Sequence, residues 1–144
     1  VGRPTARQIK TKNNNTSQEE SVKFVVVGGS GTILTSSDSN TWISENSGTS
    51  NLLSDVIYEN GTLITIGGVF VDNVSTVLKS SNGKIWTSIT TGTTKILYDV
   101  AYGINKYIST GSYGEVITSS DGSSWTLRSS GTTNQLTVRS VLEF

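Results

Sequence analysis

The sequence predicts an all-β protein made of short strands joined by many turns. Glycine occurs 15 times and proline once in the 144 residues, and the hydrophobic fraction is only 33%. Serine, threonine, asparagine and glycine all disfavour helix interiors, so a helical fold suits this composition badly. The chain also repeats itself from Lys23 onward at intervals of 44 and 39 residues, and internal repetition of this period is typical of tandem structural units. We therefore expect several small β units in a row.

Charge and residue usage exclude several classes of function. Eleven basic residues balance eleven acidic ones, so no overall field draws the chain to nucleic acid or to an anionic membrane. The absence of Cys and His excludes disulfides, thiolate chemistry, imidazole-based zinc sites and His-based acid–base catalysis. No apolar run approaches the roughly 20 residues of a membrane-spanning helix. We predict no cofactor, no metal site, and neither nucleic acid nor membrane as a partner.

Residues 1–21 form a polar region that has almost nothing to bury. Its four cations, Arg3, Arg7, Lys10 and Lys12, precede a run of three Asn residues and a Glu pair. A segment of this composition does not fold alone, and a flexible tail is the simplest interpretation. We favour an extended arm whose cations bind other proteins of a larger assembly, followed by a β domain at 22–144.

Three segments of the β domain end on a tryptophan and share one pattern. They read SSDSNTW at 36–42, SSNGKIW at 80–86 and SSDGSSW at 119–125. The tryptophans lie 44 and 39 residues apart, and the Gly-Thr turn that follows each segment keeps the same spacings. The five extra residues of the first interval fit best in a longer loop at 69–75. The register of the repeat therefore holds outside the motif as well.

These segments resemble the Asp-box, or BNR, repeats of sialidases, sortilin-type receptors, photosystem assembly factors and many phage and bacterial surface proteins. The resemblance implies that an acidic side chain accepts turn N–H groups, that Gly or Asn takes the left-handed position, and that the Trp folds back over its hairpin. The sequence departs from the family pattern in two ways. Each Trp lies four residues after the Asp or Asn of its segment, one residue fewer than in the family, and Asn82 replaces the acid in the second segment. The positions carried over are Ser36, Asp38, Trp42, Ser80, Asn82, Trp86, Ser119, Asp121 and Trp125.

The apolar runs around each segment predict four strands per repeat. The expected strands are 22–27, 32–36 and 42–45, then 54–58, 62–67, 76–80 and 86–90, then 98–102, 106–110, 115–119 and 125–129, and finally 137–144. Asn60-Gly61 is a strong two-residue hairpin signal in this set. The first repeat lacks its leading strand. The leading strands of the second and third repeats each follow a Gly-Thr turn, and 137–144 follows the third Gly-Thr turn in the same way. This is the circular permutation by which β-propellers close their ring.

Three blades are too few for a closed propeller, which needs about four or more. We expect half of a ring, completed by a partner chain in a homo-oligomer, with 137–144 of one chain beside 22–27 of the other. The alternatives are a fragment of a longer propeller, and a β-trefoil of three pseudo-equivalent repeats.

The sequence offers no convincing catalytic group. The resemblance implies that Asp38 and Asp121 serve their own turns, and the arginine triad of sialidases has only Arg128 and Arg139 as candidates outside the arm. We therefore predict a non-enzymatic structural or binding module, namely a virion component such as a phage decoration, neck or tail protein held by its arm.

Two other functions are open to the same sequence. A glycan-binding module, extracellular or at the cell surface, would use freely placed aromatic rings, for which Tyr58, Tyr102, Tyr107 and Tyr113 are candidates. The box tryptophans are expected in the core instead. An assembly factor of photosynthetic membranes is the third interpretation, and it too rests on the Asp-box resemblance.

Overall fold

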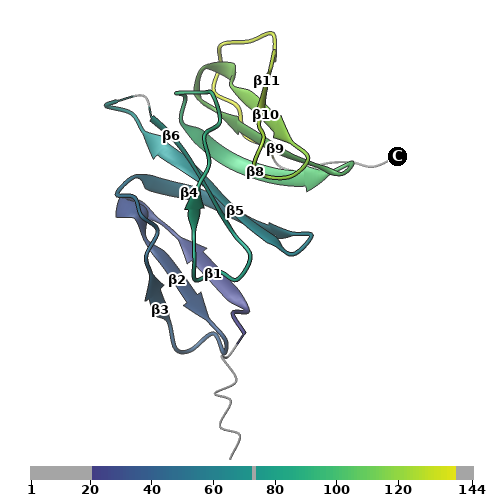
Figure 1. The fold of residues 1–144 in the computed structure, drawn as a ribbon. Helices are drawn as coiled ribbons and strands as arrows, with labels where there is room; N and C mark the ends of the chain where they lie inside the picture. Colours follow the sequence, from purple (N-terminus) through teal and green to yellow (C-terminus); the bar gives the residue numbers. More distant parts are fainter. Residues whose placement is uncertain (1–20, 73, 139–144) are drawn as a thin grey trace, which may run out of the picture.

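The computed structural model describes residues 21–72 and 74–138, and their fold is all-β (Figure 1). Three antiparallel sheets follow one another along the chain. The first sheet contains β1 (Phe24–Val27), β2 (Ile33–Ser36) and β3 (Ile43–Glu45). The second contains β4 (Leu52–Glu59), β5 (Thr62–Val69), β6 (Val74–Ser80) and β7 (Thr87–Ser88). The third contains β8 (Leu97–Gly103), β9 (Lys106–Gly111), β10 (Val116–Ser119) and β11 (Thr126–Arg128), and short 3-10 turns lie at Gly29–Gly31 and Ser112–Gly114.

Eleven of the twelve predicted strands are confirmed, with bounds that differ by at most two residues at either end. The twelfth was predicted at 137–144, where Thr137 and Val138 carry no strand and the remainder lies outside the described residues. The predicted loop at 69–75 is wrong. Here β5 extends to Val69, β6 begins at Val74, and these two residues pair, so the extra residues lengthen a hairpin.

Tight turns join the strands where the sequence predicted them. Asn60 and Gly61 both have positive φ, +50° and +71°, and connect the paired residues Glu59 and Thr62. This is the backbone of a two-residue hairpin loop, whose twist matches that of the strands it joins. The equivalent turn of the third sheet places Ile104 and Asn105 in the same left-handed region.

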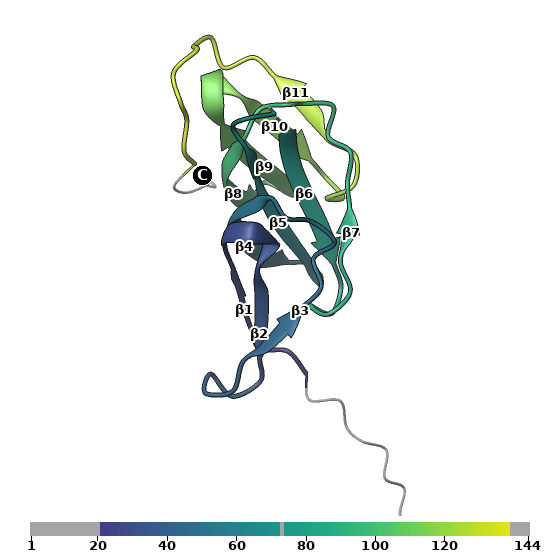
Figure 2. The ribbon, with the colours of Figure 1, turned by 90° about the vertical axis from the view of Figure 1, so that its left-hand side faces the viewer.

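The second sheet lies between the other two, and its strands are covered on both sides (Figures 1 and 2). One core cluster joins the first and second sheets through Ile33, Leu53 and Leu78. A larger cluster joins the second and third sheets and consists of Ile64, Ile66, Val77, Leu97, Val100, Tyr107 and Ile117. Burial of both faces explains why β5 is a nearly continuous apolar strand, whereas β1 alternates between half-buried and exposed side chains.

The chain passes from one sheet to the next through a recurring connection. The Leu53 N–H donates to Gly28 O at 3.0 Å as the chain leaves the first sheet and enters β4. The Leu136 N–H donates to Gly111 O at the same distance after the third sheet. Leu136 therefore makes at the third sheet the backbone contact that Leu53 makes at the first.

Within the part of the chain that the structure describes, no strand of one sheet pairs with a strand of another. These strands therefore close no barrel, and the three described sheets form no closed ring, because the first and third lie on opposite sides of the second (Figure 1). A β-trefoil needs strands of different repeats to pair around one barrel, so this alternative gains no support. None of the helical segments in the described ranges has the length and hydrophobicity to span a membrane.

Candidate interaction site

The segment 36–42 forms a turn that its own side chains hold together, hereafter the first box turn. Ser36 Oγ accepts hydrogen bonds from the N–H groups of Asp38 and Ser39, at 3.2 and 2.9 Å. Asp38 Oδ1 in turn accepts from the N–H groups of Asn40 and Thr41, both at 2.8 Å. Four backbone donors of one turn are thus satisfied by two side chains, as in an Asx-turn.

The second and third box turns, 80–86 and 119–125, repeat this network atom for atom. In the second, Asn82 Oδ1 accepts from the N–H groups of Lys84 and Ile85 at 2.9 and 3.0 Å. An amide oxygen therefore replaces the carboxylate without loss of either bond. In the third, Asp121 Oδ1 accepts from Ser123 and Ser124 at 2.8 and 2.7 Å.

These hydrogen bonds keep both box aspartates ionised. The backbone N–H groups of Thr41 and Asn40 lower the pKa of Asp38 from 3.8 to about 2. The N–H groups of Ser124 and Ser123 hold the pKa of Asp121 further below its usual range. A carboxylate of such low pKa carries protons poorly near neutral pH. Both side chains therefore serve the turn, and their geometry offers no general acid or base.

The box tryptophans do not share one environment. Trp86 packs on the cluster between the first two sheets, and Trp125 packs on the cluster between the last two. Each also donates its indole N–H to a carbonyl of its own turn, that of Gly83 or Gly122. Trp42, by contrast, is 40% exposed. The expectation that all three are core residues is wrong for Trp42, because no described sheet lies on that side of the first sheet.

Trp42 belongs to a larger apolar surface. The β1–β2 register places Phe24 opposite Ser36 and Val26 opposite Leu34, so these residues share one face of the first sheet. Phe24 and Val26 are 46% and 44% exposed, and the rings of Phe24 and Trp42 lie 6.5 Å apart. We call the surface formed by Phe24, Val26, Leu34 and Trp42 the leading face of the first sheet.

The same face is covered in the other two sheets. Leu34, Leu78 and Ile117 each stand two residues before the box serine, and Leu78 and Ile117 are buried in the inter-sheet clusters. Leading faces of the second and third sheets thus pack on the preceding sheet. Only the first sheet, among those described, has its leading face open.

A groove of about 520 Å³ runs beside the free edge of β1. Its walls come from β1 and the approach to it, from β4 and β5 and from the second box turn, and include Val22, Val25, Val56, Tyr58, Leu63 and Asn82. The groove thus lies between the first and second sheets.

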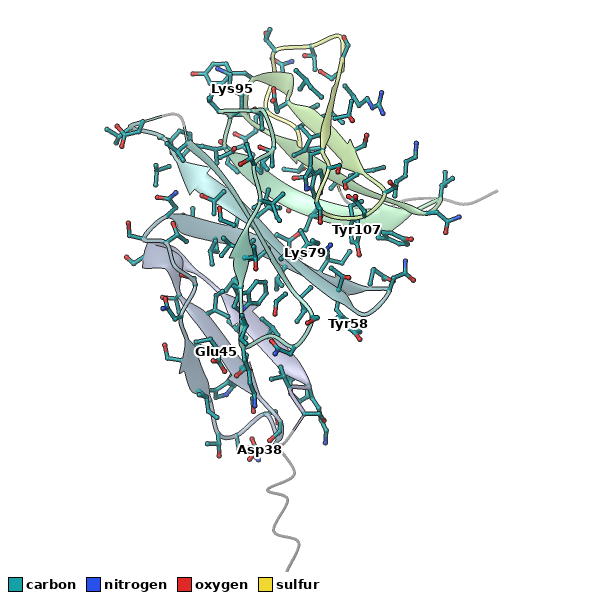
Figure 3. All side chains as sticks on the ribbon, viewed as in Figure 1. Asp38, Glu45, Tyr58, Lys79, Lys95 and Tyr107 are labelled. Carbon is teal, nitrogen blue, oxygen red and sulfur yellow. The ribbon has the colours of Figure 1, made fainter. Side chains whose placement is uncertain are left out.

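Polar ties between neighbouring sheets were missed by the sequence reasoning. Asp55 Oδ2 accepts from the Val100 N–H at 2.9 Å, which joins β4 to β8. Lys79 donates to Asp121 O and to Ser123 Oγ at 2.7 and 2.8 Å, and so joins β6 to the third box turn (Figure 3). The recurrence of Asp55 at Asp99 was a signal for the first tie, whereas no repeat of Lys79 marks the second.

The tyrosines proposed as ligand-facing also divide. Tyr107 is 3% exposed, and its hydroxyl donates to Glu59 O at 2.9 Å, so the interpretation as a free ring is wrong. Tyr102 packs on the same core and accepts from the Asn60 side chain. Tyr58 and Tyr113 are 62% and 65% exposed and face solvent. Tyr107 is buried and Tyr102 half-buried because the third sheet packs on the second.

The predicted arm residues Arg3, Arg7, Lys10 and Lys12 lie outside the described residues. In residues 21–72 and 74–138, no group of three or more acidic side chains is placed to hold a metal ion.

The chain matches no protein-family model, no curated protein and no solved structure.

Proposed function

We propose that this chain is a non-enzymatic building module of a larger assembly. Its three sheets act as consecutive Asp-box propeller blades, and a partner chain completes the ring. The open leading face of the first sheet carries this proposal, because the equivalent faces of the other two sheets are buried against a neighbour. Exposed apolar patches of this kind mark interaction surfaces.

The chemistry of the box turns supports a structural role. Asp38 and Asp121 are the acids that recur with the motif, and each is committed to two N–H groups of its own turn. Two-sided burial of the second sheet shows how such units are stabilised by stacking. The module therefore gains stability from each neighbour that it acquires.

The assembly we favour is a virion, in which the module is a decoration, neck or tail component. Compact repeat domains fastened by a charged terminal arm suit such particles, and residues 1–21 have the composition of an arm. In this proposal the cations of the arm bind acidic surfaces of neighbouring proteins.

Deletion of residues 1–20 tests the role of the arm. We expect the truncated chain to keep its β domain, seen as an unchanged far-UV circular dichroism spectrum and melting temperature, and to be lost from the purified particle. A matched variant with Arg3, Arg7, Lys10 and Lys12 changed to Gln separates charge from length. Normal incorporation of both variants would contradict the proposal that the arm is the anchor.

A further inference from the structure

We infer that the partner on the leading face of the first sheet is the third sheet of a second copy of this chain, packed head to tail. This inference rests on the proposed function, since it takes the three sheets as equivalent blades. It adds the identity of the partner and the residues that meet.

The two internal interfaces define what a leading face accepts. The opposite face of each sheet, here called the trailing face, carries Val25, Val27 and Ile33 in the first sheet and Ile64, Ile66 and Val77 in the second. The first set packs with the leading face of the second sheet, and the second set with that of the third. An aliphatic trailing face therefore meets a Trp-bearing leading face at both interfaces.

The third sheet has a trailing face of the same kind. Its register places Ile108 opposite Thr118 and Val116 opposite Arg128, at the positions of Ile64 and Val77 in the second sheet. Ile108, Val116 and Thr118 are only half-buried, whereas Ile64 and Val77 are 0% and 1% exposed. The array thus has one open trailing face at one end and one open leading face at the other.

The charges on the trailing face of the third sheet and beside the leading face of the first are also complementary. Lys79, on the trailing face of the second sheet, donates to the third box turn. Thr118 occupies the equivalent place in the third sheet, and the Arg128 guanidinium is held beside it through a 3.0 Å hydrogen bond from Nε to Thr118 Oγ1. The turn that this pair would meet in a second copy is the first box turn, which carries the ionised Asp38. A cation on the trailing face would again face a box turn.

The direction of the chain favours the same arrangement. The Leu136–Gly111 hydrogen bond repeats the Leu53–Gly28 bond, so the chain leaves the third sheet in the same way as it leaves the first. The first and third sheets of one chain lie on opposite sides of the second (Figure 1). Two copies that meet in this way at both ends close a ring.

Substitutions that place opposite charges on the two faces of the interface test the inference on the 144-residue chain. Ile64 and Tyr107 both lie beside Gly122 in the interface between the second and third sheets, within 2.6 and 3.7 Å of the position of a Cβ there. Their equivalents across the proposed interface are Ile108 of one copy and Phe24 of the other. We would prepare Phe24→Lys and Ile108→Glu separately, with Ile85→Lys and Val71→Glu as controls at positions 73% and 91% exposed.

Sedimentation equilibrium then reports the mass of each species, and circular dichroism checks that each variant is folded. We expect the wild type and both controls to show twice the 15.3 kDa chain mass. Each interface variant alone should dissociate at least tenfold more readily. An equimolar mixture of the two should recover the double mass, since one interface is then wild type and the other pairs Lys with Glu.

Three results would overturn the inference. A wild-type chain that stays monomeric at all concentrations has no second copy as its partner; if it still enters the particle, the proposed function survives. Loss of the dimer in Phe24→Lys alone, with Ile108→Glu unaffected, would show that two leading faces meet each other. Failure of the mixture to recover would show that the two faces do not meet. A stable dimer that is absent from any particle would instead contradict the virion proposal and leave this inference standing.

Discussion

Replacing Gly122 with Ala perturbs the third box turn and the core beneath it at once. Gly122 is buried and has a φ of +69°, a conformation that residues with a Cβ rarely adopt. A Cβ at this position would lie 2.6 Å from Cδ1 of Ile64, which is fully buried in the cluster between the second and third sheets. The substitution therefore combines backbone strain with overpacking.

The two effects have separate magnitudes. A left-handed Ala costs about 1–2 kcal/mol, offset by about 0.4–1 kcal/mol because Ala restricts the unfolded chain. Overpacking of a close-packed core adds about 1–3 kcal/mol. We expect Gly122→Ala to lower the free energy of unfolding by about 1–4.6 kcal/mol. Gly131→Ala is the matched control, because Gly131 has a φ of +75° and nothing lies within 4 Å of its Cβ position.

Urea denaturation followed by tryptophan fluorescence measures the difference at a single protein concentration. The control should lose only about 0–1.6 kcal/mol, since its substitution brings strain without overpacking. Equal losses in Gly122→Ala and Gly131→Ala would show that Ile64 moves aside without cost. That result would refute the overpacking of the core beneath Gly122 on which the larger loss is based.

Three further perturbations test the box turns. Asp38→Asn should flatten the dependence of stability on acid pH. Ionised Asp38 contributes fully to stability above its unfolded pKa of 3.8, and this contribution is lost as the pH falls through its folded pKa of about 2. Melting temperatures from pH 2 to 6 that superimpose on those of the wild type would contradict this. In urea titrations at concentrations where the chain is monomeric, Trp125→Ala should lower the free energy of unfolding by about 3 kcal/mol, and substitution of the exposed Trp42 by Ala should lower it by about 1 kcal/mol or less. Equal losses would argue against the difference in packing between the two tryptophans. Ser39→Gly should raise the melting temperature, because Ser39 has a φ of +67° where the other box turns have Gly; a lower value would show that its side chain is needed.

Turns and strands were predictable because their causes are local. A serine and an aspartate two residues apart close the box turn through the backbone donors beside them, whatever surrounds the hairpin. Asn60-Gly61 sets its hairpin in the same way, through the left-handed conformations that both residues tolerate. The all-β class followed from such features. The length of the β5–β6 hairpin, whose pairing reaches Val69 and Val74, did not.

The sequence alone thus determined the repeat, the class of fold and the hydrogen bonds inside each box turn, all of which depend on residues a few positions apart. The tertiary structure decided which equivalent side chains are buried. Trp42 and Trp125 occupy the same position of one motif, yet Trp125 packs on a neighbouring sheet and Trp42 lies on an open face. Burial depends on which sheet packs against a face, and residues distant in the sequence supply that surface, as when the Val100 N–H donates to Asp55, 45 positions away.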